Sequence, residues 1–416
     1  MILDTPPAPT TLLFRTLENF MNFEFATAQR IIFGCGKIDL LPELIKGLGK
    51  KAALVTGGNA ERVGPIFQIL KDAGVEPAAF SIKGEPKTDR IAKLAAGARD
   101  LGCDFVVAFG GGSVVDAGKA IAALLTNTND LMDYLEVIGK GLPLTEDPAP
   151  CIAIPTTAGT GSEVTRNAVL HSVEYGVKVS MRHPKMLPDV ALVDPELTVS
   201  VPPTVTASTG LDAFIQLLEA FMSKKATPIT DAFCREGIRR MGDSLYRAYI
   251  KGNDLEARTN MCFASLCSGL ALANGGLGVV HGFAGPIGGM FEAPHGMVCA
   301  SLLPAAAQAN YDALRARDPE NPALGKMQEV AQMVLNSPTA TIEEAIEHLK
   351  NMCTQMFVPG LEDFGINHSD IPAIVAKAKN ASSMKGNPIE LTDEELTYIL
   401  YESLHAPIDG VATLYM

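Results

Sequence analysis

The second half of the sequence carries an acid, an amide and two imidazoles at spacings that suit a metal ion. Asp212 and Gln216 are four residues apart, so both side chains would lie on one face of a helix. His281 and His295 are 14 residues apart, and glycine follows each of them. A carboxylate with two imidazoles suits Fe(II) or Zn(II) and leaves a coordination position open. Each histidine alone would also fit a hydrogen-bonded core residue.

A glycine-rich turn in the first half has the composition of a phosphate site. The apolar run 105–109 predicts a buried strand, and a helix is expected from Val114 onward. Glycines let a ligand approach the backbone, and the first turn of a helix offers unpaired N–H groups at the positive end of its dipole. A plain strand-to-helix turn would use the same glycines. The candidate cofactor-binding residues here are Gly110, Gly111, Gly112, Ser113 and Asp116.

A hydroxyl-rich loop follows another predicted strand at 149–155. Its small and hydroxyl side chains suit hydrogen bonds to the ribose and the nicotinamide amide of a dinucleotide. The candidate residues in this loop are Thr156, Thr157, Thr160 and Ser162.

The elements that must position these side chains alternate between strand and helix up to about residue 200. Strands are expected at 23–33 (two short ones), 52–56, 77–82, 105–109, 149–155 and 191–194, with helices at 39–48, up to 70, and at 89–101. This alternation predicts an α/β, doubly wound, Rossmann-like parallel sheet with helices on both faces. From Pro202 onward the pattern is all-helical. We therefore expect a mobile leader (1–20), a dinucleotide-binding domain (21–200) and an all-helical metal and substrate domain (201–416), with a cleft between the last two.

The end of the strand at 52–56 bears on the choice of cofactor. An acid near the adenosine ribose favours NAD, whereas Gly57, Gly58 and Asn59 follow this strand. Arg62 lies one turn further on. We expect NAD or NADP, with a weak preference for NADP.

Composition excludes several functions. The 416 residues carry a net charge of −13 without a basic stripe, so nucleic acid is not an expected partner. Eight cysteines form no Cys-x-x-Cys pair, which indicates free thiols in a reducing compartment, and we expect a cytoplasmic protein. Residues 259–291 lack charge and are long enough to span a membrane, but a buried central helix explains their many glycines better.

The motifs together resemble the iron-containing (group III) alcohol dehydrogenase family. The resemblance rests on the string from Gly110 to Lys119, on Pro155–Glu163, and on the metal pattern, and it spans nearly everything from Phe23 to the C-terminal helices. It implies an N-terminal Rossmann-like domain with an all-α C-terminal domain (dehydroquinate synthase-like), and metal ligation by one Asp and three His. It also implies that Asn167 and Lys178 contact the cofactor.

Two positions depart from the family pattern. Gln216 stands where the family has its second ligand, a histidine, and a glutamine oxygen is a weaker ligand for Fe(II) or Zn(II) than imidazole. Gln216 could coordinate directly, hold a water that does, or leave the site poor in metal; Glu219 is a possible substitute. Gly285 stands where some members have another histidine, so no proton relay passes through that residue.

The sequence therefore predicts an enzyme that transfers hydride between a nicotinamide cofactor and an alcohol–aldehyde or alcohol–ketone pair. The predicted catalytic residues are Asp212, His281 and His295. The alternatives are a metal-independent reductase resembling maleylacetate reductase, a cyclase resembling dehydroquinate synthase, and a cofactor-binding protein without catalysis. Apolar residues near the proposed metal suggest a small to medium uncharged substrate. We expect no membrane partner and, from the resemblance, a homo-oligomer.

Overall fold

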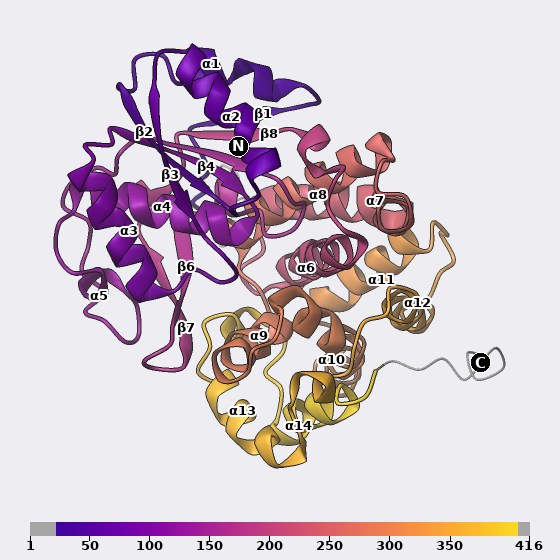
Figure 1. Cartoon of the computed structure of the whole chain (residues 1–416). Helices are drawn as coiled ribbons and strands as arrows, with labels where there is room; N and C mark the ends of the chain where they lie inside the picture. Colours follow the sequence, from indigo (N-terminus) through magenta and orange to yellow (C-terminus); the bar gives the residue numbers. More distant parts are fainter. Residues whose placement is uncertain (1–21, 407–416) are drawn as a thin grey trace, which may run out of the picture.

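The computed structural model of the chain describes residues 22–406, so the predicted leader at 1–20 lies outside the described residues. A parallel sheet of six strands, in the order β1-β8-β5-β4-β2-β3, forms the centre of the first half (Figure 1). A separate antiparallel pair joins β6 to β7. The strands are β1 (Arg30–Phe33), β2 (Lys51–Thr56), β3 (Glu76–Ser81), β4 (Phe105–Gly110), β5 (Cys151–Pro155), β6 (Asn167–Ser172), β7 (Val177–Arg182) and β8 (Val190–Val193). The predicted parallel α/β architecture is confirmed.

Helices cover both faces of this sheet because successive side chains of a strand point to opposite faces. Along β4, Val106 packs in the cluster that includes α3 and α4, whereas Phe105 and Val107 pack with α1 and α2 on the other face. The helices of this half are α1 (Leu41–Leu44), α2 (Ala60–Asp72), α3 (Thr88–Asp100), α4 (Gly112–Thr126) and α5 (Leu131–Tyr134).

The strand order creates a switch point between β2 and β4. The chain passes from β2 to β3 on one side and then returns to place β4 on the other side of β2. Ligands of open parallel sheets bind outside the carboxyl ends of the strands at such a point. The Gly57-Gly58 and Gly110–Ser113 turns follow these two strands, so the topology places them together at the position expected for a cofactor.

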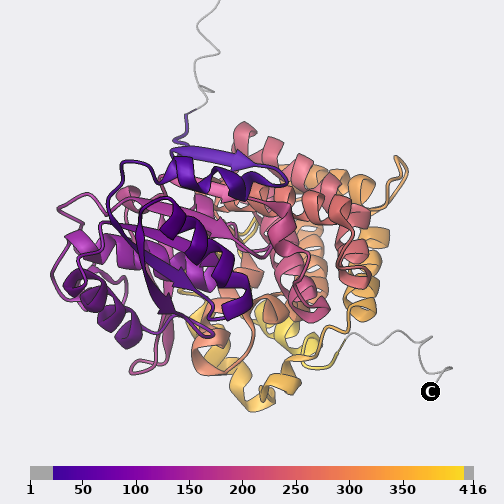
Figure 2. The same cartoon turned by 45° about the horizontal axis from the view of Figure 1, so that its top comes forward.

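The second half is helical, and among the described residues no strand follows β8. Figures 1 and 2 show these helices beside the sheet, in pink to yellow. The secondary structure changes between Val193 and Pro203, a segment that contains the proposed domain boundary at 200/201. The helices are α6 (Pro203–Met222), α7 (Pro228–Ile250), α8 (Leu255–Gly275), α9 (Val279–Met290), α10 (His295–Arg317), α11 (Pro322–Val334), α12 (Ile342–Gln355), α13 (Ile371–Ala378) and α14 (Asp393–Glu402).

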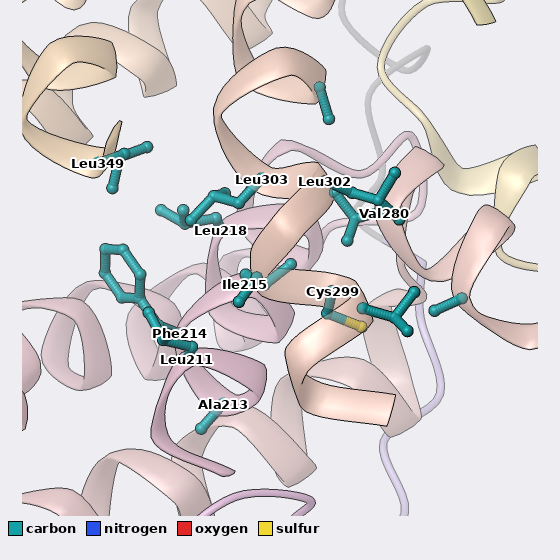
Figure 3. Close-up of a cluster of buried hydrophobic side chains, with 14 of the residues drawn as sticks. Leu211, Ala213, Phe214, Ile215, Leu218, Val280, Cys299, Leu302, Leu303 and Leu349 are labelled. Atoms are coloured by element: carbon teal, nitrogen blue, oxygen red, sulfur yellow. The ribbon is translucent and has the colours of Figure 1, made fainter. Parts of the chain in front are cut away.

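Helix α6 is the central element of this half. It packs against α7, α8 and α10, and its Leu211, Phe214 and Ile215 are buried in the largest apolar cluster of the described chain. Figure 3 shows Ile215 beside Leu302 and Leu303 of α10, within the same apolar cluster. Because α6 is enclosed on several sides, any polar group on it needs a partner inside the protein.

Two predictions near the N-terminus were wrong in detail. Residues 23–33 hold one strand, β1, instead of two, because the backbone of Ala26 pairs with the side chain of Asn274. The amide of Ala26 donates to Oδ1 of Asn274 (2.8 Å), and Nδ2 of Asn274 donates to the carbonyl of Ala26 (3.1 Å). The helix expected at 39–48 is reduced to a 3-10 turn, Lys37–Leu40, followed by the short α1.

The single central helix expected between residues 259 and 291 was also wrong, because the segment breaks between α8 and α9. Gly276 adopts φ +74°, a backbone conformation that ends the helix, and the two helix axes are bent by 95°. Among residues 22–406, no single helix is long and apolar enough to cross a membrane, although the bent pair of α8 and α9 is so by length and composition together.

The β6–β7 hairpin was not predicted. Its strands alternate between buried and partly exposed positions around a turn at Gly176, which adopts φ +59°. The alternation of apolar and polar residues is visible in the sequence of both strands. It was overlooked because the polar residues of the hairpin follow directly on the hydroxyl-rich loop and resemble its continuation.

A close approach of two glycines joins the sheet half to the helical half. Gly161 lies in the loop after β5, and a Cβ added to Gly269 of α8 would lie 2.5 Å from the carbonyl oxygen of Gly161. Real Cβ atoms do not come this close to backbone, so this contact requires glycine at position 269.

We predict that Gly269→Ala lowers the free energy of unfolding by about 1–3 kcal/mol, because the added methyl group overpacks a rigid backbone contact. Urea unfolding would measure this loss. Gly242→Ala in α7 is the control, since its Cβ would meet nothing within 4 Å. It should raise stability by up to about 1 kcal/mol. Equal stability of the two variants would contradict the importance of the contact.

Candidate active site

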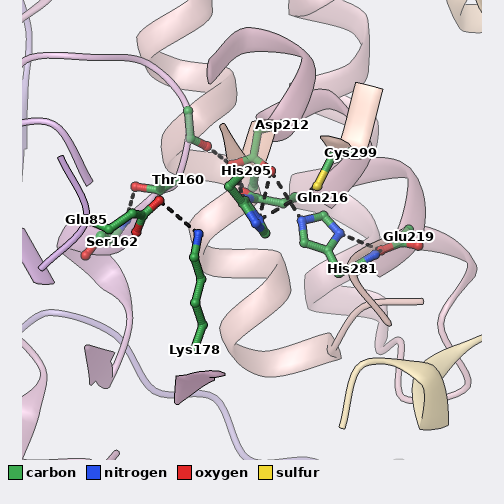
Figure 4. A network of polar contacts seen from close by, with 12 residues as sticks. Glu85, Thr160, Ser162, Lys178, Asp212, Gln216, Glu219, His281, His295 and Cys299 are labelled. Atoms are coloured by element: carbon green, nitrogen blue, oxygen red, sulfur yellow. Dashed lines mark hydrogen bonds and ion pairs between the residues drawn. The ribbon is translucent and has the colours of Figure 1, made fainter. Parts of the chain in front are cut away.

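Three of the predicted metal ligands come together from three helices. Asp212 lies on α6, His281 on α9 and His295 at the start of α10. Oδ1 of Asp212 is 3.3 Å from Nε2 of His281 and 3.7 Å from Nε2 of His295 (Figure 4). One carboxylate oxygen thus faces two imidazole nitrogens, an arrangement whose donors fit a divalent cation.

Cys299 completes this cluster, and the sequence analysis missed it. It lies four residues after His295 on α10, and its Sγ is 3.7 Å from Nε2 of His295. Among the described residues, Asp212, His281, His295 and Cys299 are the one group of three or more His, Cys, Asp or Glu side chains whose possible ligand atoms all lie within 4.8 Å of one another. The spacing of His295 and Cys299 was the available signal, because residues four apart share a helix face.

Glu219 positions His281. Its Oε2 lies 2.7 Å from Nδ1 of His281, and its Oε1 accepts a hydrogen bond from the amide of Val280 (2.6 Å). A carboxylate at Nδ1 holds the proton there and leaves Nε2 free to face Asp212. Glu219 therefore orients the predicted ligand His281 through Nδ1 and does not serve as a substitute ligand itself.

Gln216 is held away from the centre of the cluster. Its Nε2 donates to Oδ2 of Asp212 (3.1 Å), and its Oε1 lies 2.9 Å from the hydroxyl of Ser268 on α8. The structure therefore places Gln216 next to the predicted metal centre with its oxygen facing Ser268.

The ionisable groups of the cluster change one another's pKa values. Burial raises the pKa of Asp212, but the hydrogen bond from His281 and the charge of His295 bring that pKa below its ordinary value. Burial lowers the pKa of His281, yet the charge of Cys299 and the hydrogen bond to Asp212 raise it well above the usual range. Burial likewise raises the pKa of Cys299, and the two imidazoles bring it below the ordinary thiol value. The cluster is an electrostatic unit that favours charged side chains.

The cluster is open on one side. The His295 side chain is 33% exposed, whereas those of Asp212 and His281 are 3% and 6% exposed. His295 therefore marks the side from which a substrate oxygen could approach the centre.

The surroundings of α9 differ in part from expectation. The apolar residues that suggested an uncharged substrate are Phe214, Phe283 and Ile287, and all three are buried in the core. Gly285, one turn after His281, has nothing within 4 Å of where its Cβ would lie, so the structure leaves open space there. Two other glycines of α9, Gly282 and Gly289, are close-packed against their neighbours.

The predicted cofactor turns lie against each other. Helix α4 begins at Gly112 with Gly111 as its N-cap, and no side chain caps its first amides. A Cβ on Gly112 would lie 2.5 Å from Thr160, and one on Gly111 would lie 3.3 Å from Oγ1 of Thr157. The uncapped helix start and the hydroxyl loop therefore form one continuous surface whose chemistry fits a dinucleotide phosphate.

Asp116 and Lys119 bind the loop rather than facing outward. The carboxylate of Asp116 accepts hydrogen bonds from the hydroxyl of Ser162 (2.5 Å) and the amide of Val169 (3.0 Å). The fully buried ammonium of Lys119 lies 3.0 Å from Asp116 and donates to the carbonyl of Ser162 (2.9 Å), to Thr165 and to the carbonyl of Asn167. This network fixes the course of the chain from the hydroxyl loop into β6.

The hairpin carries the remaining two cofactor candidates. Asn167 begins β6, and Lys178 lies on β7 with its Nζ 2.9 Å from Glu85 (Figure 4). A Cβ on Gly288 of α9 would lie 3.1 Å from Nζ of Lys178, so Lys178 reaches the helix that carries His281. The structure thus places Lys178 between the sheet half and the metal cluster.

The turn after β2 is shaped by local contacts. Gly58 adopts φ +85°, and Asn59 caps α2 by accepting hydrogen bonds from the amides of Glu61 and Arg62. The guanidinium of Arg62 donates to the carbonyl of Leu197 (2.5 Å), so it is already engaged. Among residues 22–406, the buried hydroxyl of Ser81 has no hydrogen-bond partner, and it lies 2.5 Å from where a Cβ on Gly58 would be.

Comparison with known proteins covers nearly the whole described chain. A family model described as iron-containing alcohol dehydrogenase matches residues 28–195, and the C-terminal model of the Fe-containing alcohol dehydrogenase family matches residues 206–404. The 1,3-propanediol dehydrogenase of Klebsiella pneumoniae is 34% identical over 400 residues, which cover 92% of this chain and 100% of that protein.

Solved structures of the same family have a similar fold. A crystal structure of 1,3-propanediol oxidoreductase has a TM-score of 0.84 at 33% identity, with 92% of this chain and 100% of that chain covered. The sulfoacetaldehyde reductase of Bifidobacterium kashiwanohense, solved in complex with NAD+, has a TM-score of 0.82 at 29% identity, with 92% and 99% covered. The expected fold, a Rossmann-like domain followed by a helical domain, is thereby confirmed.

We predict that Lys119→Met lowers the free energy of unfolding by about 3–5 kcal/mol, because it leaves Asp116 and several carbonyl groups without their buried partner. Urea unfolding would measure this effect. The control is Lys93→Met, whose ammonium lies 3.8 Å from Asp89 with both side chains exposed. That change should cost less than about 0.5 kcal/mol. Similar losses for both lysines would contradict the assigned role of Lys119.

Proposed function

This chain belongs to the iron-containing alcohol dehydrogenase family and interconverts an alcohol and an aldehyde; we propose that it does so by hydride transfer to or from a nicotinamide cofactor, with a divalent metal ion held by Asp212, His281 and His295. The single observation that carries the metal proposal is the convergence of a carboxylate and two imidazoles from α6, α9 and α10. The expected ion is Fe(II), as the family description implies, with Zn(II) as the alternative. When bound, the ion supplies Lewis acidity toward the substrate oxygen, and the nicotinamide supplies the hydride.

The chain's own residues prepare this site. Glu219 fixes the proton of His281 on Nδ1, which directs Nε2 toward Asp212. The partly exposed His295 lies at the open side, where the substrate would enter. Because Gly285 has no side chain, we propose that the proton exchanged with the alcohol oxygen moves through water or a cofactor hydroxyl.

The polar surroundings support an uncharged substrate of small to medium size. Lys178 is the cation drawn beside the cluster in Figure 4, and Glu85 neutralises it at 2.9 Å. A clear preference for a dicarboxylate would overturn this part of the proposal.

The cofactor proposal is NADP as well as NAD. Its support is the absence of an acid directly after β2, where Gly57 and Gly58 lie, since an acid near the ribose would repel the extra phosphate of NADP. The position of Arg62 does not add to it, because that guanidinium is bonded to Leu197.

A metal-independent reductase is the second candidate. The observation in its favour is that the amide of Gln216 donates to Asp212, which partly satisfies the carboxylate without a metal. Metal removal separates the two candidates.

We predict that the chelator-stripped protein loses NADH- or NADPH-dependent reduction of an aldehyde panel, and that Fe(II) or Zn(II) restores it. Asp212→Ala with His281→Ala should lower turnover at least about a hundredfold, because Lewis acidity contributes several kcal/mol to the transition state. The double variant should still bind cofactor in a fluorescence titration. His405→Ala, an exposed histidine, is the control. Activity that survives chelation and the double variant would establish the metal-independent reductase instead.

We predict that Gly57→Asp raises the dissociation constant for NADPH at least about tenfold while leaving that for NADH within about twofold. A carboxylate there would face the 2′-phosphate, and like charges in contact cost several kcal/mol. The added Cβ meets nothing within 4 Å, so the fold should tolerate the change. Gly57→Asn, with the same shape and no charge, is the matched control. Equal weakening of both cofactors would show that the ribose does not lie at this turn.

A further inference from the structure

We propose that the thiolate of Cys299 is the fourth protein ligand of the metal. It takes the place of the histidine ligand that the family pattern has at position 216, where this chain has glutamine. This inference rests on the proposed metal site and deepens it, because it assigns the donor that the sequence pattern leaves out. It also favours Zn(II) over Fe(II), since a thiolate is a softer donor than imidazole or carboxylate.

Three of the six separations between donor atoms are close to the edge length of tetrahedral coordination. For bonds of about 2.0–2.3 Å to nitrogen, oxygen and sulfur, the edges of a tetrahedron are about 3.3–3.6 Å long. In the structure, the separations are 3.3 Å and 3.7 Å from Oδ1 of Asp212 to Nε2 of His281 and Nε2 of His295, and 3.7 Å from Sγ of Cys299 to Nε2 of His295. All four ligand atoms lie within 4.8 Å of one another. Shorter separations for the remaining pairs would let the four side chains share one ion, and the open side at His295 leaves a further position for the substrate oxygen.

Gln216 is poorly placed to supply the fourth donor. Its oxygen faces the hydroxyl of Ser268, and its amide group donates to Asp212. Rotating the carboxamide would bring its oxygen to 3.1 Å from a carboxylate oxygen, and neither atom carries a proton for the other. The hydrogen-bonding preference of Gln216 thus holds it beside the ligand Asp212.

The surroundings of Cys299 differ from those of a neighbouring buried cysteine. Sγ of Cys353 on α12 donates to the carbonyl of Ala300, a backbone partner on α10. Sγ of Cys299 instead faces the imidazoles of His295 and His281 (Figure 4). Figure 3 shows the carbon atoms around it as an apolar wall that includes Val280 and Ile215. A buried thiol that faces two imidazoles and a carboxylate is in the environment of a metal ligand.

The charge of the proposed site also balances. On binding, the thiol gives up its proton to solvent and coordinates as thiolate. Asp212 and the Cys299 thiolate then supply two negative charges to a divalent cation, and the two histidines bind as neutral imidazoles. A Gln216 ligand would contribute no charge and would leave the ion less well compensated in a buried position.

The test uses Co(II) as a spectroscopic probe of the chelator-stripped full-length protein. A cobalt–thiolate bond gives an intense ligand-to-metal charge-transfer band in the near ultraviolet, which oxygen and nitrogen ligands do not give. We expect the wild-type protein to develop this band to saturation at one Co(II) per chain. Cys299→Ser should lack the band and bind Co(II) and Zn(II) at least about tenfold more weakly. Cys353→Ser, the matched buried control, should keep both the band and the affinity.

A second pair of variants tests the exchange of donors. Gln216→Ala should keep the charge-transfer band, because the oxygen of Gln216 is not a ligand. Gln216→His combined with Cys299→Ser should recover the metal affinity without the band, since an imidazole then replaces the thiolate. This recovery also shows that the loss in Cys299→Ser does not come from misfolding.

The outcomes separate this inference from the proposed function. Stoichiometric Co(II) binding to the wild-type protein without the band would overturn the role of Cys299 and leave the metal site intact. Loss of metal in Gln216→Ala, but not in Cys299→Ser, would assign the fourth donor to Gln216 and overturn the inference. Failure of the wild-type protein to bind Co(II), Zn(II) or Fe(II) would overturn both the inference and the metal-assisted function.

Discussion

The burial of two carboxylates on one face of α6 is the constraint on which the site depends. Asp212 and Glu219 are seven residues apart, and their side chains are 3% and 7% exposed inside the apolar helical core. Ionised groups in such a place require cationic or proton-donating partners. His281 lies between them, 2.7 Å from one and 3.3 Å from the other, so one imidazole compensates both. The break between α8 and α9 matters for the same reason, because α9 begins where its first amides and His281 meet Glu219.

Close backbone contacts between glycines hold the two halves of the molecule together, and these contacts leave no room for a side chain. Gly161 and Gly269 bring the hydroxyl loop against α8, and Gly289 of α9 packs on the backbone at Gly176 of the hairpin. Lys119 then fixes the loop from within, through its bonds to Ser162 and Asn167. Hydride transfer needs the reacting groups aligned at contact distance, and a rigid join between the halves provides a basis for that alignment. The same join explains why Lys178 of the sheet half reaches α9.

The parts of the structure that the sequence predicts well are those determined by local patterns. The buried strands at β2, β4 and β5 and the helical second half follow from apolar runs and periodicity, and the spacing of Asp212 and Gln216 gave their shared helix face. The errors occur where the local structure depends on a contact with a residue far away in the sequence or on the break of a helix. Asn274 pairs with the backbone of Ala26 and replaces a predicted strand, and the glycines after α8 break a segment whose composition resembles one long helix. Cys299 was missed because its four-residue spacing from His295 is common in any helix, and only the fold brings His281 of α9 beside it.

In the proposed site, Cys299 supplies the fourth donor in place of position 216. A metal site can in this way take one ligand from a different position and keep four protein donors. Position 216 is on α6 and position 299 is on α10, so the two donors would approach the ion from different helices. The exchange nevertheless keeps the number of protein donors at four, because Cys299 follows His295 by one turn and shares its face. It also gives the ion a negatively charged ligand, because the thiol releases its proton to solvent on binding, whereas a glutamine oxygen is neutral. The side of the cluster at His295 stays open, so substrate access does not depend on which of the two positions supplies the donor.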